Sequence, residues 1–231
     1  MASLPRTYTF PPLEAASPEG LLAVGGDLNP DRLLSAYRQG VFPWFSNGQP
    51  ILWWSPDPRA ILYPTNLHIS RSLRKNMRTQ GFEVTADRAF DRVIEVCAES
   101  RNAREGTWIT SGMQEAYCAL HQMGYAHSVE TWQNGRLVGG LYGLAIGKAF
   151  FGESMFSQIT DASKTALVGL TTSLAAGGYH FIDCQVVSEH LNSLGAQAVP
   201  RYRFSSELKQ AVEIPVNGTP WNWTTAAREL S

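Results

Sequence analysis

The apolar residues of this chain recur with two periods, one typical of helices and the other typical of strands. Three segments repeat them every three or four positions, as an amphipathic helix does: 87–97, 111–123 and 161–176. Segment 126–132 alternates instead, and Asn134-Gly135 then favours a tight hairpin turn into a second strand at 136–142. Three further elements complete the predicted core: strands at 149–153 and 179–185 and a short helix at 188–194.

The N-terminal part of the chain has a different texture. Asn29 is expected to cap a helix that starts with Pro30 and ends at Gly40. Between residues 41 and 59, aromatic residues stand among four prolines, which forbid a long helix or a central strand there. Packed aromatics on such an irregular backbone indicate the core of a small domain or the wall of a binding site.

The residue pattern changes near residue 62, where we place a domain boundary. A small N-terminal domain is expected over 1–62 and a larger domain over 63–231. The larger domain starts with a basic helix at 70–79 and a strand at 82–85, and its pattern predicts no clear element after Arg203. The expected fold class is α+β, with a mixed, mainly antiparallel sheet in the larger domain.

Composition and charge exclude several classes of protein. The 231 residues are 44% hydrophobic and 17% charged with a formal net charge of −1, so no global field attracts nucleic acid. The three cysteines form no C-x-x-C pair and the five histidines show no metal-ligand spacing, so neither a disulfide framework nor a metal site is expected. The chain shows no signal peptide and no membrane span, and a cytoplasmic protein is expected.

Charge is distributed asymmetrically in only one segment, the helix predicted at 70–79. No acidic residue occurs between Arg59 and Phe82, whereas four basic residues follow the i, i+3, i+4, i+7 rule and share one helical face. These residues are Arg71, Arg74, Lys75 and Arg78. Such a face suits a nucleic-acid backbone, but most charged runs are merely solvated helix surfaces, and the pattern alone leaves both interpretations open.

Two apolar stretches contain acidic residues that need partners or a task. Glu153 lies among three phenylalanines and a methionine in the stretch 150–157, and Asp183 interrupts the stretch 181–185. Burial of an unpaired carboxylate is costly, so each acid is either hydrogen-bonded for structural reasons or part of a site. Both interpretations remain open from the spacing.

The order hairpin, third strand, helix, fourth strand, helix is that of an acyl-CoA N-acetyltransferase-like core. In that fold a glycine-containing loop before the first helix holds the CoA pyrophosphate with its amides. The corresponding segment here, 157–165, contains no glycine. We therefore expect no CoA site and an acyl donor that is not carried on CoA.

Aminolysis of an activated ester requires no covalent enzyme intermediate. It requires an amine held against the carbonyl, and such positioning is worth roughly 7–11 kcal/mol. Asp183, with Gln185 two residues further on the same strand face, can orient an incoming ammonium and guide its proton away. A nucleophilic serine is poorly supported, because Ser154 lacks a G-x-S-x-G turn.

Seven motifs of the chain are long enough to be specific. In the larger domain they are Phe151-Gly152-Glu153-Ser154-Met155-Phe156-Ser157, Asp161-Ala162-Ser163-Lys164, Ile182-Asp183-Cys184-Gln185 and Ser193-Leu194-Gly195-Ala196. In the smaller domain they are Gly25-Gly26-Asp27-Leu28, Gly40-Val41-Phe42-Pro43-Trp44-Phe45 and Leu52-Trp53-Trp54-Ser55-Pro56-Asp57-Pro58-Arg59. Together they resemble the bacterial leucyl/phenylalanyl-tRNA–protein transferase family, from about Gly20 to Arg203.

The resemblance implies an enzyme that moves Leu or Phe, and Met less well, from aminoacyl-tRNA to the α-amino group of proteins that begin with Arg or Lys. The product would then be a substrate for N-degron degradation. The resemblance also implies a small N-terminal domain and an acetyltransferase-like C-terminal domain, acting as a monomer without metal, CoA or another cofactor.

The resemblance further implies roles for single residues. Asp183 and Gln185 take catalytic positions, and Glu153 lies at the acceptor and 3′-adenosine end. The implied pocket for the aminoacyl side chain consists of Leu141, Phe150, Gly152, Met155, Leu167, Leu170 and Ile182. The implied aromatic contacts to adenosine and acceptor peptide are Tyr37, Trp44, Trp108 and Tyr117. The basic face of the 70–79 helix matches the surface that holds the tRNA acceptor stem.

The residues agree with these roles, with two departures. An apolar pocket accepts an unbranched or γ-branched side chain and crowds a β-branched one, although Leu141 and Leu170 replace the expected Met and Phe and leave the Leu-to-Phe preference open. Gln185 is too weak a base to deprotonate an ammonium, so we expect it to position groups while Asp183 supplies charge and a tRNA hydroxyl relays the proton. Two rival hypotheses remain, a CoA-dependent N-acetyltransferase and a non-catalytic tRNA- or peptide-binding module.

Overall fold

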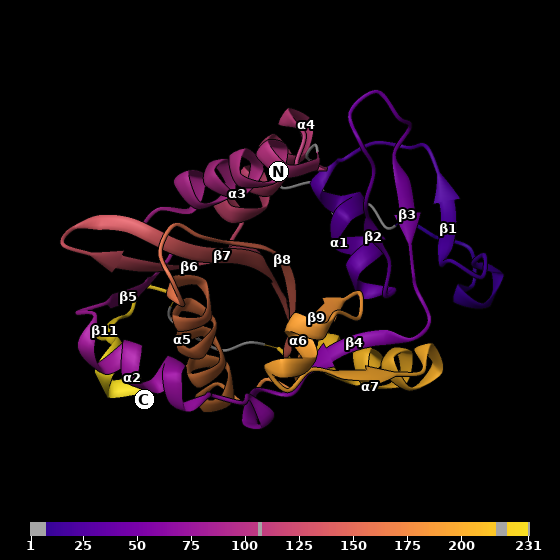
Figure 1. Ribbon diagram of the computed structural model, residues 1–231. Coiled ribbons are helices and arrows are strands. Elements are labelled where there is room, and N and C mark those ends of the chain that lie inside the picture. Colours follow the sequence, from indigo (N-terminus) through magenta and orange to yellow (C-terminus); the bar gives the residue numbers. More distant parts are fainter. Residues whose placement is uncertain (1–7, 106–107, 216–220, 231) are drawn as a thin grey trace.

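The computed structural model describes residues 8–105, 108–215 and 221–230. These residues form a small sheet near the N-terminus and a large sheet that occupies most of the remaining chain (Figure 1). The small sheet is antiparallel and has the order β1-β3-β2. Its strands are β1 (Leu21–Val24), β2 (Phe42–Pro43) and β3 (Leu52–Trp54).

The large sheet contains eight strands in the described residues, in the order β10-β4-β9-β8-β7-β6-β5-β11. Neighbouring strands are antiparallel except for the parallel pair β8 and β9. The expected α+β class with a mixed, mainly antiparallel sheet is therefore confirmed. The strands are β4 (Arg59–Leu62), β5 (Glu83–Ala86), β6 (Ala126–Gln133), β7 (Arg136–Ile146), β8 (Ala149–Ser157), β9 (Phe181–Gln185), β10 (Gln197–Val199) and β11 (Thr224–Ala226).

Helices cover both faces of the large sheet (Figure 1). The core on the face of α3 and α4 includes Phe151, and the core on the face of α5 includes Phe150, because successive strand residues point to opposite sides. The α-helices are α1 (Pro30–Arg38), α2 (Arg71–Thr79), α3 (Phe90–Glu105), α4 (Ser111–Gln122), α5 (Ala162–Ala176), α6 (Glu189–Ser193) and α7 (Arg201–Glu213). Short 3₁₀ helices occupy Leu13–Ala15, Pro64–Asn66 and Ala227–Leu230. In the described part of the chain, no helix is both long and apolar enough to cross a membrane.

Local signals account for the element ends. The Asn29 side chain accepts the Asp31 amide at 3.0 Å at the start of α1, and the Ser70 side chain accepts the Leu73 amide at 3.2 Å at the start of α2. The predicted hairpin is also confirmed. Asn134 and Gly135 have φ values of 51° and 73°, the positive values that a tight turn between β6 and β7 requires.

The prediction that prolines exclude a central strand from residues 41–59 is wrong. β3 lies between β1 and β2, and β4, which begins at Arg59, lies inside the large sheet. Both strands avoid the rule because their own residues contain no proline, and Pro58 only precedes the first residue of β4. The small sheet thus ends at Trp54, and pairing in the large sheet begins at Arg59.

The C-terminal stretch, for which the pattern predicts no clear element, forms α7 and β11. Phe204, Leu208 and Ala211 of α7 are buried at helical spacing, so a short amphipathic signal was present in the sequence. β11 pairs with β5 at the edge of the large sheet and has no recognisable pattern of its own, because it is only three residues long.

Candidate active site

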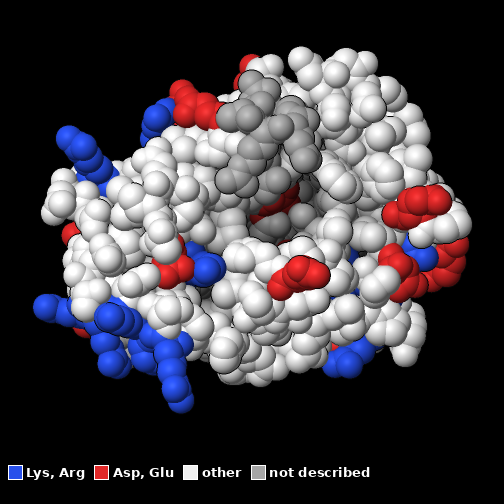
Figure 2. Space-filling view, in the orientation of Figure 1, with Lys and Arg blue, Asp and Glu red and all other residues white. Residues whose placement is uncertain are grey.

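The strands β8 and β9 run in parallel only briefly. Their pairing covers three residues of each strand and stops at Phe151 and Asp183. Beyond this point a cavity of about 490 Å³ opens, and it is lined by residues from the ends of both strands, which no longer pair with each other there. Figure 2 shows it as a hollow near the middle of one face of the molecule. The splayed strand ends therefore create the cavity.

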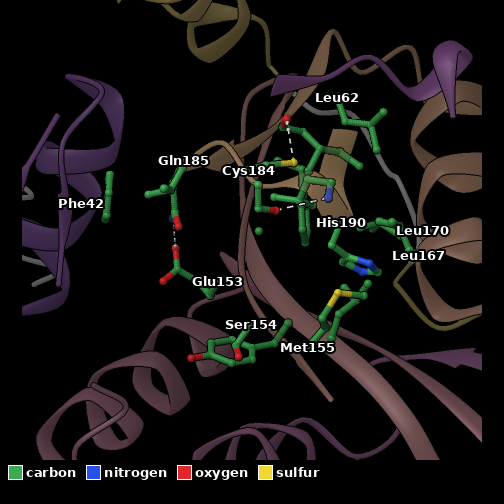
Figure 3. Close-up of a pocket in the computed structure, with 18 of the residues that line it drawn as sticks. Phe42, Leu62, Glu153, Ser154, Met155, Leu167, Leu170, Cys184, Gln185 and His190 are labelled. Carbon is green, nitrogen blue, oxygen red and sulfur yellow. Dashed lines mark hydrogen bonds between the residues drawn. The ribbon is translucent and has the colours of Figure 1, made fainter. Parts of the chain in front are cut away.

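Most of the cavity wall is apolar. The seven residues that the resemblance implies for the aminoacyl pocket all line it: Leu141, Phe150, Gly152, Met155, Leu167, Leu170 and Ile182. They come from β7, β8, α5 and β9, which follow one another along the chain, and Figure 3 labels Met155, Leu167 and Leu170 among them. Together these seven residues form an apolar slot, which is large enough for one amino-acid side chain and adjoining groups.

Several lining residues are not indicated by the sequence patterns. Leu62 comes from β4 and Phe42 from β2, and three residues come from α6 and the residue before it: Ser188, His190 and Leu191. Long-range pairing of β4 with β9 brings Leu62 to the slot, and spacing along the chain carries no signal for such pairing. The signal available for α6 was only its position directly after the Asp183 motif.

Glu153 forms the polar end of the slot and is 7% exposed. It accepts hydrogen bonds from the Tyr37 hydroxyl at 2.6 Å and the Tyr117 hydroxyl at 2.9 Å. It also accepts one from the Gln185 amide Nε2 at 2.9 Å, which Figure 3 shows. Burial raises the pKa of Glu153 to about 7, helped by the charge of Asp183 and opposed by these three hydrogen bonds. Glu153 can therefore exchange a proton near neutral pH.

Asp183 does not line the cavity. Its side chain is fully buried and receives two hydrogen bonds from Arg59, from Nε at 2.8 Å and from Nη2 at 2.6 Å. Asp183 Oδ1 also accepts the backbone amide of Gln185 at 2.9 Å. The structure thus places Gln185 at the cavity surface and Asp183 behind it, out of reach of a molecule in the slot.

The four aromatic residues implied for adenosine and peptide contacts separate into two pairs. Trp44, which is 46% exposed, and Trp108 line the mouth of the cavity. Tyr37 and Tyr117 are fully buried behind Glu153, where their hydroxyl groups also contact each other. Burial raises the pKa of both tyrosines well above the usual range, so both remain neutral donors to Glu153.

The four basic residues of α2 lie on the helix face opposite its buried side. Leu73 and Met77 point into the core, whereas Arg71, Lys75 and Arg78 are exposed and Arg74 is half-buried. Figure 2 shows the resulting basic cluster over α2 on the same side of the molecule as the hollow. The structure therefore brings the basic face and the cavity to one surface.

Two regions could in principle hold a cofactor or a metal ion. In the first turn of α5, directly after the glycine-free loop, the Ser163 amide donates to Ser157 Oγ at 3.1 Å, so this amide is not directed at a phosphate. Asp87, His121 and His127 place ligand atoms within 4.8 Å of one another, which the spacing in the sequence does not indicate. Hydrogen bonds from the Ser128 amide at 2.8 Å and His127 Nδ1 at 2.7 Å already engage both oxygens of Asp87.

Comparison with known proteins identifies relatives over nearly the whole chain. The family profile described as leucyl/phenylalanyl-tRNA protein transferase matches residues 61–209, and the profile of the N-terminal domain of the same family matches residues 26–57. The leucyl/phenylalanyl-tRNA–protein transferase of Stutzerimonas stutzeri is 58% identical over 209 residues, which cover 90% of this chain and 92% of that protein.

Two further relatives carry the same name. The protein from Pseudomonas fluorescens strain SBW25 is 58% identical over 93% of this chain and 96% of its own length. The protein from Nitrosomonas europaea is 57% identical over 92% of this chain and 91% of its own length. Two profiles and identities of this size show that the chain belongs to the leucyl/phenylalanyl-tRNA–protein transferase family.

Proposed function

We propose that this protein is an aminoacyltransferase that moves Leu, Phe and, less well, Met from aminoacyl-tRNA to the α-amino group of proteins that begin with Arg or Lys. The observation that carries the proposal is the apolar slot with Glu153 and Gln185 at its polar end. The relatives named above, which are leucyl/phenylalanyl-tRNA–protein transferases, support the same activity. Marking of the products for N-degron degradation and action in the cytoplasm as a monomer belong to this proposal.

The slot is proposed to bind the side chain of the donor amino acid. Leu167, Leu170 and Met155 offer flexible apolar walls, which fit the linear or γ-branched side chains of Met and Leu and the flat ring of Phe. The ester carbonyl would then lie near the polar end, with the 3′-adenosine at the mouth between Trp44 and Trp108. The basic face of α2 would contact phosphates of the acceptor stem.

The proposed reaction is direct aminolysis. The acceptor α-nitrogen attacks the ester carbonyl, a C–N bond forms, the C–O bond to the ribose breaks, and the ribose oxygen takes up a proton as it leaves. In the described residues Glu153 is the only acid that lines the cavity, and its pKa of about 7 suits it to take the proton from the acceptor ammonium. The Gln185 amide positions Glu153, and Asp183 contributes negative charge from behind.

The acceptor is proposed to carry positive charge because the acids near the cavity favour it. Glu153 is at the polar end, and Glu189 is exposed on α6 between Ser188 and His190, which both line the cavity. A guanidinium or ammonium side chain can form charge-assisted hydrogen bonds with such a carboxylate. We propose that Glu189 contacts the first side chain of the acceptor.

A transfer assay tests the proposed function. Purified protein is incubated with labelled Leu-tRNA, Phe-tRNA or Val-tRNA and a peptide that begins with Arg. We expect transfer from the first two donors and far less from Val-tRNA, because a β-branched side chain crowds the slot. Equal transfer from all three would contradict the pocket assignment.

Two alternatives have distinct outcomes. Transfer of an acetyl group from acetyl-CoA, with tight binding of acetyl-CoA in calorimetry, would favour a CoA-dependent N-acetyltransferase. Binding of Phe-tRNA without any transfer would favour a non-catalytic binding module. We expect neither result.

A further inference from the structure

Gln185 occupies an unfavourable backbone conformation. Its φ is 65°, in the left-handed region that residues with a branched or long side chain seldom adopt. The Val186 amide donates to the Cys184 carbonyl across it at 2.8 Å, which is the i to i+2 hydrogen bond of a γ-turn. Such a turn persists only where the surrounding structure holds it.

The turn coincides with an irregularity between β4 and β9. Ala60 is opposite Gln185 and Ile61 is opposite Asp183, so Cys184 is an extra residue on β9. Bulges of this kind redirect side chains next to sites. Here the redirected side chain is that of Gln185, whose amide reaches Glu153 at 2.9 Å.

Hydrogen bonds of Asp183 link this turn on β9 to Arg59 on β4, across the bulge. Asp183 Oδ1 accepts the Gln185 amide at 2.9 Å and the Arg59 Nε–H at 2.8 Å, so one oxygen joins the turn to the guanidinium. The central carbon of the guanidinium lies over two aromatic rings, 4.8 Å from the Phe42 centroid and 4.5 Å from the Phe204 centroid. These two cation–π contacts and the two hydrogen bonds to Asp183 hold the Arg59 side chain in place.

Stability alone does not explain this pair. Both side chains are fully buried, and replacement of a buried ion pair by apolar residues is often neutral or stabilising. In addition, Arg59 Nη1 is buried without a hydrogen-bond partner in the described part of the chain, which adds to the cost of burying the pair. A role at the site would account for a buried pair whose net contribution to stability is expected to be small.

We propose that Arg59 is a positioning residue for aminoacyl transfer. It fixes Asp183, the Asp183 carboxylate holds the strained turn, and the turn aims the Gln185 amide at Glu153. Asp183 therefore acts through Gln185 and contacts neither the donor nor the acceptor. This inference rests on the proposed function and extends it to a residue outside the cavity.

The decisive experiment replaces the pair by apolar residues of similar size, Arg59→Met together with Asp183→Leu. We expect the double variant to unfold at about the wild-type temperature and to keep the KM for Phe-tRNA. We expect kcat to fall about 100-fold, as misplacement of a catalytic group by about 1 Å does. Recovery of wild-type kcat in the double variant would show a purely structural pair and overturn the proposal.

A matched control and a second readout keep the test decisive. Arg201→Met removes an arginine of α7 that lies 4.0 Å from Asp57 and donates to the Ser55 carbonyl at 2.6 Å, in the loop between β3 and β4, and it should leave kcat unchanged. Arg59→Lys keeps the positive charge and is the second variant in case the double variant does not fold. In Arg59→Lys we expect the NMR resonance of the Gln185 backbone amide to shift and kcat to fall. An unmoved resonance with wild-type kcat would overturn the proposal.

The NMR readout also separates this inference from the proposed function. If the wild-type protein transfers neither Leu nor Phe, the proposed function fails. The Gln185 resonance in Arg59→Lys still reports whether Arg59 holds the turn, because it requires no substrate.

Discussion

The cavity and the basic face of α2 lie on the same side of the molecule but are built in opposite ways (Figure 2). The cavity has apolar walls and a single lining acid, Glu153, among the described residues, which suits selection by shape and control of one proton. The face of α2 presents cations on the side away from the buried Leu73 and Met77, which suits binding by charge without selection by shape. If the cavity and the α2 face bind the same aminoacyl-tRNA, the rate of transfer and the selectivity among donors depend on the cavity. The affinity for tRNA and its salt dependence then depend on α2.

The largest expected effect is on rate and tests whether the cavity carries the chemistry. Glu153→Gln keeps the size of the side chain but removes its charge and its capacity to take a proton. We expect kcat for Phe transfer to an Arg-initiated peptide to fall roughly 100- to 1000-fold, with little change in tRNA binding. Single-turnover kinetics would measure it. Glu213→Gln, on the exposed surface of α7, is the control, and an effect of similar size there would refute the assignment.

The second effect is on affinity and tests whether α2 acts by charge alone. Replacement of all four basic residues of α2 by Ala should weaken binding of Phe-tRNA roughly 100-fold and reduce the slope of log K against log salt by about 3 to 4. The kcat at saturating tRNA should not change. Filter binding at several salt concentrations would measure the slope. Arg92→Ala, which removes an exposed arginine paired with Glu95 on α3, should leave the slope as it is.

Local signals in the sequence predicted much of the fold and part of the site. The Asn29 cap and the Asn134-Gly135 turn act within a few residues, so they could be recognised without the fold. The burial of Asp183 could not, because its partner Arg59 is 124 positions away and meets it only through the pairing of β4 with β9. The sequence therefore singled out Glu153 and Asp183, and only the structure showed that Glu153 is the one that lines the cavity.

The third effect is a pH dependence that is specific to the cavity. Since burial raises the pKa of Glu153 to about 7, its carboxylate is mostly protonated near pH 6 and mostly charged near pH 8. We expect kcat to rise about tenfold over this range if the charged form takes the proton. A profile that Glu153→Gln reproduces unchanged would contradict this role.

The free energy of unfolding should fall with rising pH, whereas kcat should rise. The folded protein binds the Glu153 proton more tightly than the unfolded chain, in which the pKa is close to 4.5. The free energy of unfolding should therefore decrease as pH rises between about 4.5 and 7, and Glu153→Gln should remove this part of the slope. Denaturant unfolding at several pH values would measure it.

The fourth effect concerns choice by shape. Leu170→Phe fills part of the slot on the α5 side, and we expect it to favour Leu-tRNA over Phe-tRNA by roughly fivefold in kcat/KM, because apolar shape discriminates by about 1–3 kcal/mol per methylene. Competition between the two labelled donors would measure the ratio. Leu174→Phe, in the same helix but outside the cavity, should lower stability without a change in the ratio. A ratio that does not respond at Leu170 would show that the donor side chain binds elsewhere.

The smallest effect tests whether the rim of the cavity also recognises the charge of the acceptor peptide. Glu189→Lys reverses the only charge that α6 places between two lining residues, Ser188 and His190. Because an exposed ion pair is worth about 0.2–1 kcal/mol, we expect preference for an Arg-initiated over a Glu-initiated peptide to fall only two- to fivefold in KM, with kcat unchanged. The loss should shrink at high salt, as it does for α2 but without a change in tRNA affinity. A loss in kcat instead would show that Glu189 takes part in the reaction, as proposed for Glu153. The cavity would then use charge as well as shape, which contradicts the contrast with α2.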